Sequence, residues 1–101
     1  PVVATMIPVV NVQLRQNVPN PFNPTTQIQF VLTGRQHVVL SVYDSNGRLV
    51  RTLLNDVRNS GEQNVTWDGR DGAGRTAASG IYFYRLEAGS FNESRKMLLL
   101  K

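Results

Sequence analysis

The chain has 101 residues and a formal net charge of +4 at pH 7. This length corresponds to one domain, which buries roughly 60–70% of the surface that its unfolded chain exposes. The sequence contains no cysteine and one histidine, His37, which excludes disulfides, thiolate metal sites and sites built from several histidines.

The basic residues are scattered along the chain rather than clustered. A nucleic-acid-binding domain is typically marked by a basic stripe or a known motif, and neither is present, so we predict no nucleic-acid partner.

No apolar run is long enough to cross a membrane. The first ten residues, PVVATMIPVV, lack a positively charged region and an initiator methionine, so they do not resemble a signal peptide and suggest a fragment of a longer protein.

Taken in order, the chain begins with a predicted linker, Pro1–Pro8, because its two prolines keep it out of the centre of a sheet. A domain over residues 9–101 then opens with a first strand at Val9–Arg15. The next segment, Asn17–Thr26, holds three prolines and three asparagines. Prolines push the preceding residue into extended conformations and Asn-Pro pairs initiate turns, so this segment predicts an ordered loop with Phe22 directed inward.

Six further strands are predicted, separated by turn signals such as Asn46-Gly47. The strand Leu49–Asn55 is partly apolar on both faces, so its inward side stays open. No segment has a sustained helical period. About seven short strands at spacings near ten residues predict an all-β antiparallel sandwich. The six strands are Thr26–Leu32, His37–Asp44, Leu49–Asn55, Glu62–Trp67, Ile81–Ala88 and Phe91–Leu100.

The centre of this sandwich is predicted from the stretch Asn64–Leu86. It carries Trp67, the only tryptophan, and a strand on which Tyr82, Tyr84 and Leu86 share one face by the two-residue period. We expect these four side chains to form the middle of the core.

The candidate reactive groups do not form a recognisable catalytic or metal site. Asp68 and Asp71 are three residues apart, whereas calcium loops place acids at alternate positions. A structural turn is therefore favoured, and ion binding by the Asp68–Gly74 loop stays open. His37 has Ser41 and Asp44 nearby in sequence, but there is no nucleophile-elbow motif. We expect no enzyme activity and no cofactor.

Exposed aromatic rings are the usual platform of a carbohydrate-binding module. If the other aromatic residues pack inside, only Tyr43, Phe83 and Phe91 stay available for such a surface. Packing between sheets or at an edge is the favoured interpretation of these three rings. A carbohydrate- or cell-surface-binding module is kept as an alternative function, and a structural spacer as a further one.

Five motifs follow one another in an order that resembles the C-terminal sorting domains of the type IX (Por) secretion system, and the related immunoglobulin-like domain of the flagellar hook-capping protein. The resemblance covers about Leu14 to Lys101. The motifs are Asn17–Thr26, Val42-Tyr43-Asp44 with Gly47-Arg48, Trp67–Asp71, Ser79–Tyr82 and Lys96–Leu99.

This resemblance implies an immunoglobulin-like sandwich that acts as a non-catalytic C-terminal domain of a larger secreted protein. It implies export by the type IX machinery and attachment at the outer-membrane cell surface, with an anionic lipopolysaccharide as a possible partner. The family's proline motif maps onto Pro19-Asn20-Pro21. One departure is Val18, where the family commonly has tyrosine.

The same resemblance, together with the basic and apolar end of the chain, suggests the recognition surface. An edge strand of this kind can be bound by strand addition or by docking. The candidate recognition residues are Gly80, Tyr82, Arg95, Lys96, Met97, Leu98, Leu99, Leu100 and Lys101.

Overall fold

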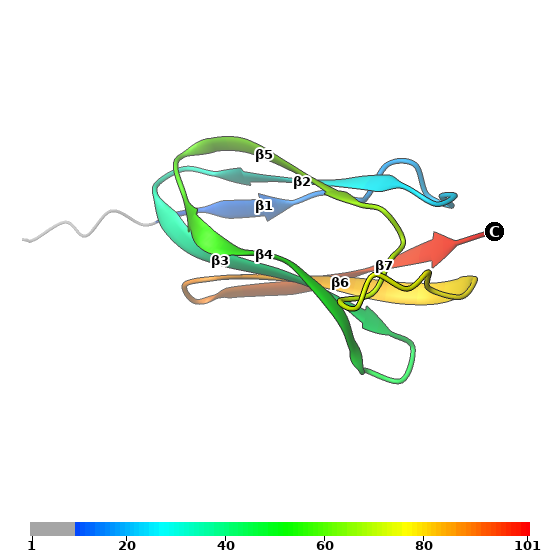
Figure 1. Cartoon of the computed structure of the whole chain (residues 1–101). Coiled ribbons are helices and arrows are strands. Elements are labelled where there is room, and N and C mark those ends of the chain that lie inside the picture. The colour runs from blue at the N-terminus through cyan, green and yellow to red at the C-terminus, as the bar shows by residue number, and fades with distance from the viewer. Residues whose placement is uncertain (1–9) are drawn as a thin grey trace, which may run out of the picture.

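The computed structural model describes residues 10–101 and contains seven β-strands and no helix in that range (Figure 1). The predicted all-β class is confirmed. The described residues form no helix that is long and apolar enough to cross a membrane. The predicted linker Pro1–Pro8 lies outside the described residues. The strands are β1 Val12–Leu14, β2 Thr26–Leu32, β3 Gln36–Asp44, β4 Leu49–Arg58, β5 Gly61–Trp67, β6 Gly80–Ala88 and β7 Phe91–Leu99.

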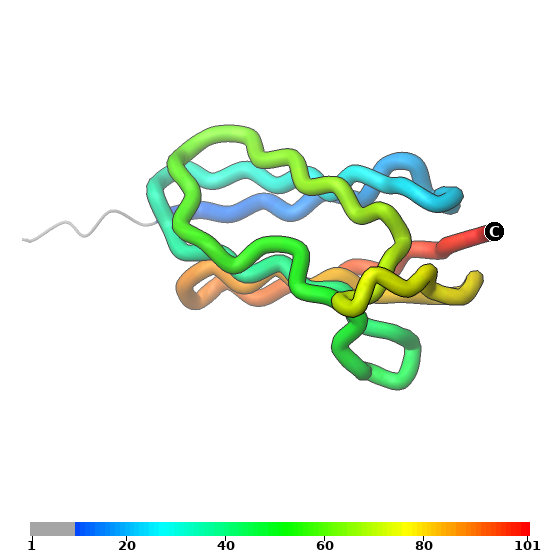
Figure 2. Tube along the Cα trace, viewed as in Figure 1, coloured from blue at the N-terminus to red at the C-terminus, as the bar shows by residue number. Residues whose placement is uncertain are grey.

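The strands form two antiparallel sheets that face each other as a sandwich (Figures 1 and 2). The smaller sheet has the order β1-β2-β5 and the larger sheet β4-β3-β6-β7. All strand pairs within the sheets are antiparallel. Consecutive strands change sheet between β2 and β3, between β4 and β5, and between β5 and β6. This two-sheet arrangement is the immunoglobulin-like sandwich that the sequence predicts.

The core lies between the sheets and is built from the inward-facing positions of each strand. Trp67, Tyr84 and Leu86 are fully buried and Tyr82 nearly so, which confirms the predicted centre. The Trp67 ring meets the Tyr82 ring edge-on at a centroid distance of 5.3 Å, a favoured geometry for aromatic pairs. The other buried apolar residues are Leu14, Phe22, Ile28, Phe30, Leu32, Val38, Leu40, Val42, Leu54, Ala88, Met97 and Leu99.

Strand β4 differs from its prediction at its C-terminal end. It continues to Arg58, although its last residues are polar enough to suggest a turn, because they pair with the first half of β3. The pairing of β3 with β4 shifts register between Leu40 and Ser41 and again between Val42 and Tyr43. A bulge exchanges the faces of the residues beyond it, which explains why the sequence of β4 shows no consistent inward side.

The proline-rich loop is fixed to the core at its start and its middle. Phe22 is buried, as predicted, and its ring lies 5.6 Å from that of Trp67. The Tyr84 hydroxyl accepts a hydrogen bond from the backbone N–H of Asn17 at 2.9 Å and donates one to the carbonyl of Arg15 at 2.7 Å. These bonds satisfy buried backbone groups that would otherwise be costly to bury.

Gly69 follows β5 where the chain passes directly against the proline-rich loop. Its φ is +76°, and a Cβ atom at this position would lie 2.8 Å from the backbone oxygen of Pro24. Alanine would therefore combine an unfavourable backbone conformation with a contact that cannot relax cheaply.

We expect Gly69→Ala to lower the free energy of unfolding by about 1–3 kcal/mol, measured by urea denaturation followed by circular dichroism. Gly72→Ala is the matched control, since its nearest contact would be at an ordinary 3.8 Å and its φ lies outside the left-handed region. Equal effects of the two changes would contradict this explanation.

Candidate functional site

The pairing of β6 with β7 brings the two parts of the predicted recognition surface together. Gly80 lies opposite Leu99, and Tyr82 lies opposite Met97. Residues that are 15 to 19 positions apart in sequence therefore form one end of the larger sheet. The position of β7 at the edge of that sheet is as expected.

Fewer than half of the nine candidate residues present a side chain to the surface. Tyr82, Met97 and Leu99 point into the core and are buried. The alternate positions point outward, so Leu100 is 47% exposed, and Ile81, which lies opposite Leu98, is 44% exposed. A partner of the folded domain can therefore contact the outward set but not the inward one.

We call this outward set the terminal face: Ile81, Lys96, Leu98 and Leu100. It includes a small hollow of about 190 Å³ that Ile81, Lys96 and Leu98 share with Asn20 and Met97. No carboxylate lines this hollow. Within residues 10–101, Lys96 and Lys101 make no ion pair. The terminal face is therefore apolar with a basic margin.

Arg95 and Lys101 have other roles in the fold. Arg95 faces the space between the sheets and lies 3.8 Å from the Glu93 carboxylate. The backbone N–H of Lys101 donates to the Ser79 hydroxyl at 2.9 Å. This last bond ties the end of the chain to the segment that leads into Gly80.

The outer edge of β7 is already occupied near its C-terminal end. The Phe22 N–H donates to the Leu98 carbonyl at 3.0 Å, and the Leu100 N–H donates to the Phe22 carbonyl at 3.0 Å. The Leu98 N–H donates to the Asn20 side chain at 3.0 Å. Strand addition beside Leu98 would have to displace these bonds, so docking on side chains is the mode that this part of β7 favours.

The fold keeps apart the side chains that the sequence offers as candidate catalytic groups. His37 and Asp44 lie near opposite ends of β3, and seven residue steps of a strand span roughly 23 Å. Ser41, between them, is buried. Asp68 is engaged by Arg51 at 3.1 Å and by the N–H of Arg70 at 3.1 Å. Within residues 10–101 no three metal-ligating side chains gather.

The fold contains a repeated turn that our sequence analysis did not recognise. Asp44–Arg48 and Asp71–Arg75 both have the pattern Asp-x-x-Gly-Arg. In each turn one Asp Oδ1 accepts two backbone N–H bonds at 2.9 Å, from the residues two and four positions later. The glycine of each turn has a φ of +83°. The spacing of Asp, Gly and Arg was the available signal for this turn.

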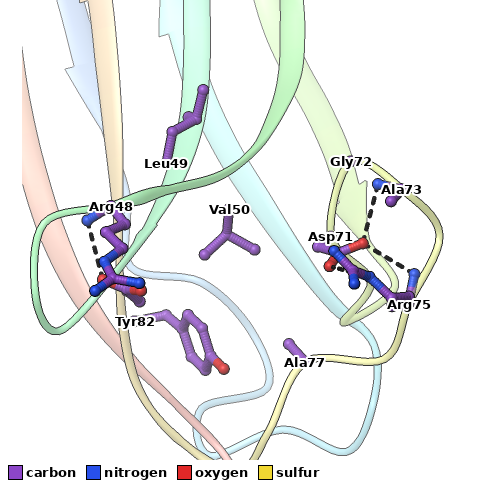
Figure 3. Close-up of a pocket in the computed structure, with 10 residues that line it drawn as sticks. Arg48, Leu49, Val50, Asp71, Gly72, Ala73, Arg75, Ala77 and Tyr82 are labelled. Atoms are coloured by element: carbon purple, nitrogen blue, oxygen red, sulfur yellow. Dashed lines mark hydrogen bonds and ion pairs between the residues drawn. The ribbon is translucent and has the colours of Figure 1, made fainter.

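These two turns lie on either side of an open hollow of about 480 Å³. We call it the two-turn hollow (Figure 3). Asp44 and Arg48 line it from one turn, and Asp71 and Arg75 from the other. Between them lies a mostly apolar floor made of Leu49, Val50, Ala77 and Tyr82.

The charges at this hollow are held in position by local bonds. The N–H of Arg75 holds the pKa of the Asp71 carboxyl below its usual value, and the Arg75 guanidinium lies 3.3 Å from the same carboxylate. The Gly72 N–H donates to the Val50 carbonyl at 3.0 Å and so fastens the second turn to β4.

The seven-strand sandwich defines the class of this protein as an immunoglobulin-like domain, a class that is typically non-catalytic. The chain belongs to the FlgD Ig-like domain family, whose model matches residues 17–91. No curated protein matches the sequence.

Three solved structures share the fold. Dimeric latent PorU from Porphyromonas gingivalis has a TM-score of 0.76 and 21% identity over 97% of this chain and 10% of its own. PorZ, a surface component of the type-IX secretion system of the same bacterium, has a TM-score of 0.59 and 19% identity over 91% of this chain and 11% of its own.

The third structure is the Pseudomonas fluorescens alkylpurine DNA glycosylase AlkC bound to DNA. It has a TM-score of 0.56 and 17% identity over 89% of this chain and 30% of its own. The chain therefore spans a tenth to a third of the proteins whose structures it matches.

Proposed function

We propose that this chain is the non-catalytic C-terminal domain of a larger secreted protein, and that it directs export through the type IX secretion system and attachment at the cell surface. In this proposal the terminal face is the surface that the machinery contacts. The basic margin of that face would favour an acidic partner surface or an anionic lipopolysaccharide.

The observation that carries the proposal is the terminal face itself. Exposed aliphatic side chains such as Ile81 and Leu100 contribute little to the stability of an isolated domain. Grouped with Lys96 on one surface, they match the mixture of apolar and charged contacts that is typical of protein interfaces. The sequence resemblance implies a C-terminal position in the parent protein, which is where a sorting signal of this kind would lie.

The proposal is supported by the occurrence of this fold in a component of the type-IX secretion system. PorZ contains a domain of this fold and is itself a surface component of the type-IX secretion system. The AlkC structure is bound to DNA, but six of the nine arginines of this chain pair with carboxylates, which leaves few free for phosphate groups.

The test measures secretion of the full-length parent protein in a type IX-competent bacterium. We expect the double variant Lys96→Ala and Leu100→Ser to lower the amount secreted by about tenfold or more, since truncating central contacts of an interface typically costs this much binding. Deleting Met97–Lys101 is a weaker test, because it removes the two buried core residues Met97 and Leu99 and is therefore expected to destabilise the domain as well.

The matched control is the double variant Arg35→Ala and Val57→Ser. It also removes one exposed basic residue and one partly exposed aliphatic residue, since Val57 is 42% exposed against 47% for Leu100. Unchanged secretion of a folded Lys96→Ala and Leu100→Ser variant would refute the proposal and favour a carbohydrate-binding module or a spacer.

A further inference from the structure

We propose that the two-turn hollow is a binding site for one sugar residue of a glycan. The hollow lies between the turn Asp44–Arg48 and the turn Asp71–Arg75 and is separate from the terminal face. The inference therefore does not depend on the proposed role in secretion.

The two walls of the hollow carry a mixture of hydrogen-bonding groups. Each wall supplies one carboxylate, which only accepts hydrogen bonds, and one guanidinium, which only donates them. A sugar hydroxyl both donates and accepts, so neighbouring hydroxyls can satisfy a carboxylate and a guanidinium together. The planar guanidinium of arginine can donate two parallel N–H hydrogen bonds, so it can bind two oxygen atoms at once.

The charges that line the hollow balance one another, which disfavours other ligand classes. The lining contains two acidic and two basic side chains. A simple anion would meet Asp44 and Asp71, and a simple cation would meet Arg48 and Arg75. A purely apolar ligand would strip water from all four charges without replacing their hydrogen bonds, which is costly. A neutral polar ligand avoids each of these penalties.

The floor and the size of the hollow also fit a sugar ring. Val50, Ala77 and the edge of Tyr82 form a mostly apolar surface between the charged walls, as Figure 3 shows. The C–H groups on one face of a sugar ring can pack on such a surface while its hydroxyls reach the walls. A volume of about 480 Å³ lies within the range of small-molecule sites, roughly 300–1,000 Å³.

A peptide is the competing neutral ligand, and the structure disfavours it. Extended peptides usually bind by pairing their backbone with a free strand edge. Beside the hollow, the Val50 carbonyl of β4 already accepts the Gly72 N–H at 3.0 Å. A peptide entering there would lose the backbone pairing that normally gives it affinity.

The walls are also preorganised, which lowers the cost of binding. The Arg48 N–H donates to Asp44 and the Arg75 N–H donates to Asp71, both at 2.9 Å. These bonds involve the backbone of each arginine, so they do not depend on its side chain. Replacing either arginine by alanine should therefore remove a ligand contact and keep the turn.

The experiment titrates the ¹⁵N-labelled domain and follows its backbone amides by NMR. The sugars are the neutral monosaccharides glucose, mannose, galactose and N-acetylglucosamine, each at millimolar concentrations. At least one should shift, saturably, the amides that donate to the two aspartates, namely those of Asn46, Arg48, Ala73 and Arg75. Arg48→Ala and Arg75→Ala should each weaken binding about tenfold, as expected for a charged hydrogen bond.

Arg35→Ala is the matched control. Arg35 is exposed, makes no ion pair within residues 10–101, and lies in the turn at the opposite end of β3 from the hollow. Its replacement should leave binding unchanged. Inorganic phosphate and a glycine-alanine peptide are titrated in parallel. The inference is overturned if either shifts the four amides at lower concentration than every sugar, if no sugar shifts them, or if both arginine variants bind as the wild type does.

Discussion

Trp67→Ala should destabilise the domain by about 3–5 kcal/mol, a large part of the 5–15 kcal/mol that typically stabilises a domain. The indole is fully buried and packs against the rings of Phe22 and Tyr82. Its Nε1–H also donates to the Arg70 carbonyl at 2.9 Å. Truncation would therefore open a cavity between the sheets and leave that carbonyl without its partner. Urea denaturation followed by circular dichroism measures the loss.

Trp67→Phe separates packing from the hydrogen bond. Phenylalanine keeps a ring between Phe22 and Tyr82 but cannot donate to Arg70, so we expect an intermediate loss of about 1–3 kcal/mol. If Trp67→Ala cost less than about 1 kcal/mol, the indole would not be the centre of the core.

Alkaline pH should destabilise the domain through its buried tyrosines. Burial raises the pKa of Tyr84 to about 12, although the Asn17 N–H opposes this shift. Burial, followed by the charge of Asp44, raises the pKa of Tyr82. A folded-state pKa above the unfolded value of 10 gives stability that is complete below pH 10 and is lost as the pH rises toward 12. For Tyr84 this loss reaches about 3 kcal/mol.

Tyr84→Phe is the variant that tests this prediction, since other groups also titrate above pH 10. It should be less stable than the wild type at pH 7, because the Asn17 N–H and the Arg15 carbonyl lose their partner. Between pH 10 and pH 12 its stability should fall less steeply, so that the two curves approach each other. Parallel curves would show that Tyr84 is not the group responsible.

The strands with one clearly buried face could be predicted from the sequence. In β2 the side chains of Ile28, Phe30 and Leu32 alternate with more polar neighbours, and the strand has its predicted bounds. The burial of Trp67 and Phe22 followed from the same reasoning. The alternation of apolar and polar residues along a strand indicates which face packs against the core, and in these segments the other face is not equally apolar.

Other features depend on contacts between distant residues, which a local pattern does not contain. The polar end of β4 forms a strand only because β3 is available to pair with it. The burial of Met97 and Leu99 within the predicted recognition segment depends on the phase of β7 relative to β6. The two-turn hollow requires Asp44 and Asp71, 27 positions apart, to lie on either side of it. Their shared turn pattern was visible in the sequence, but their proximity was not.

The bonds between the proline-rich loop and β7 also determine when this fold can be completed during synthesis. Phe22 pairs with Leu98 and Leu100, and Gly80 lies opposite Leu99. None of these earlier segments has its final neighbours until residues 98–100 have left the ribosome. The nascent chain therefore stays incompletely packed until that moment, which prolongs the period in which a chaperone can hold it unfolded.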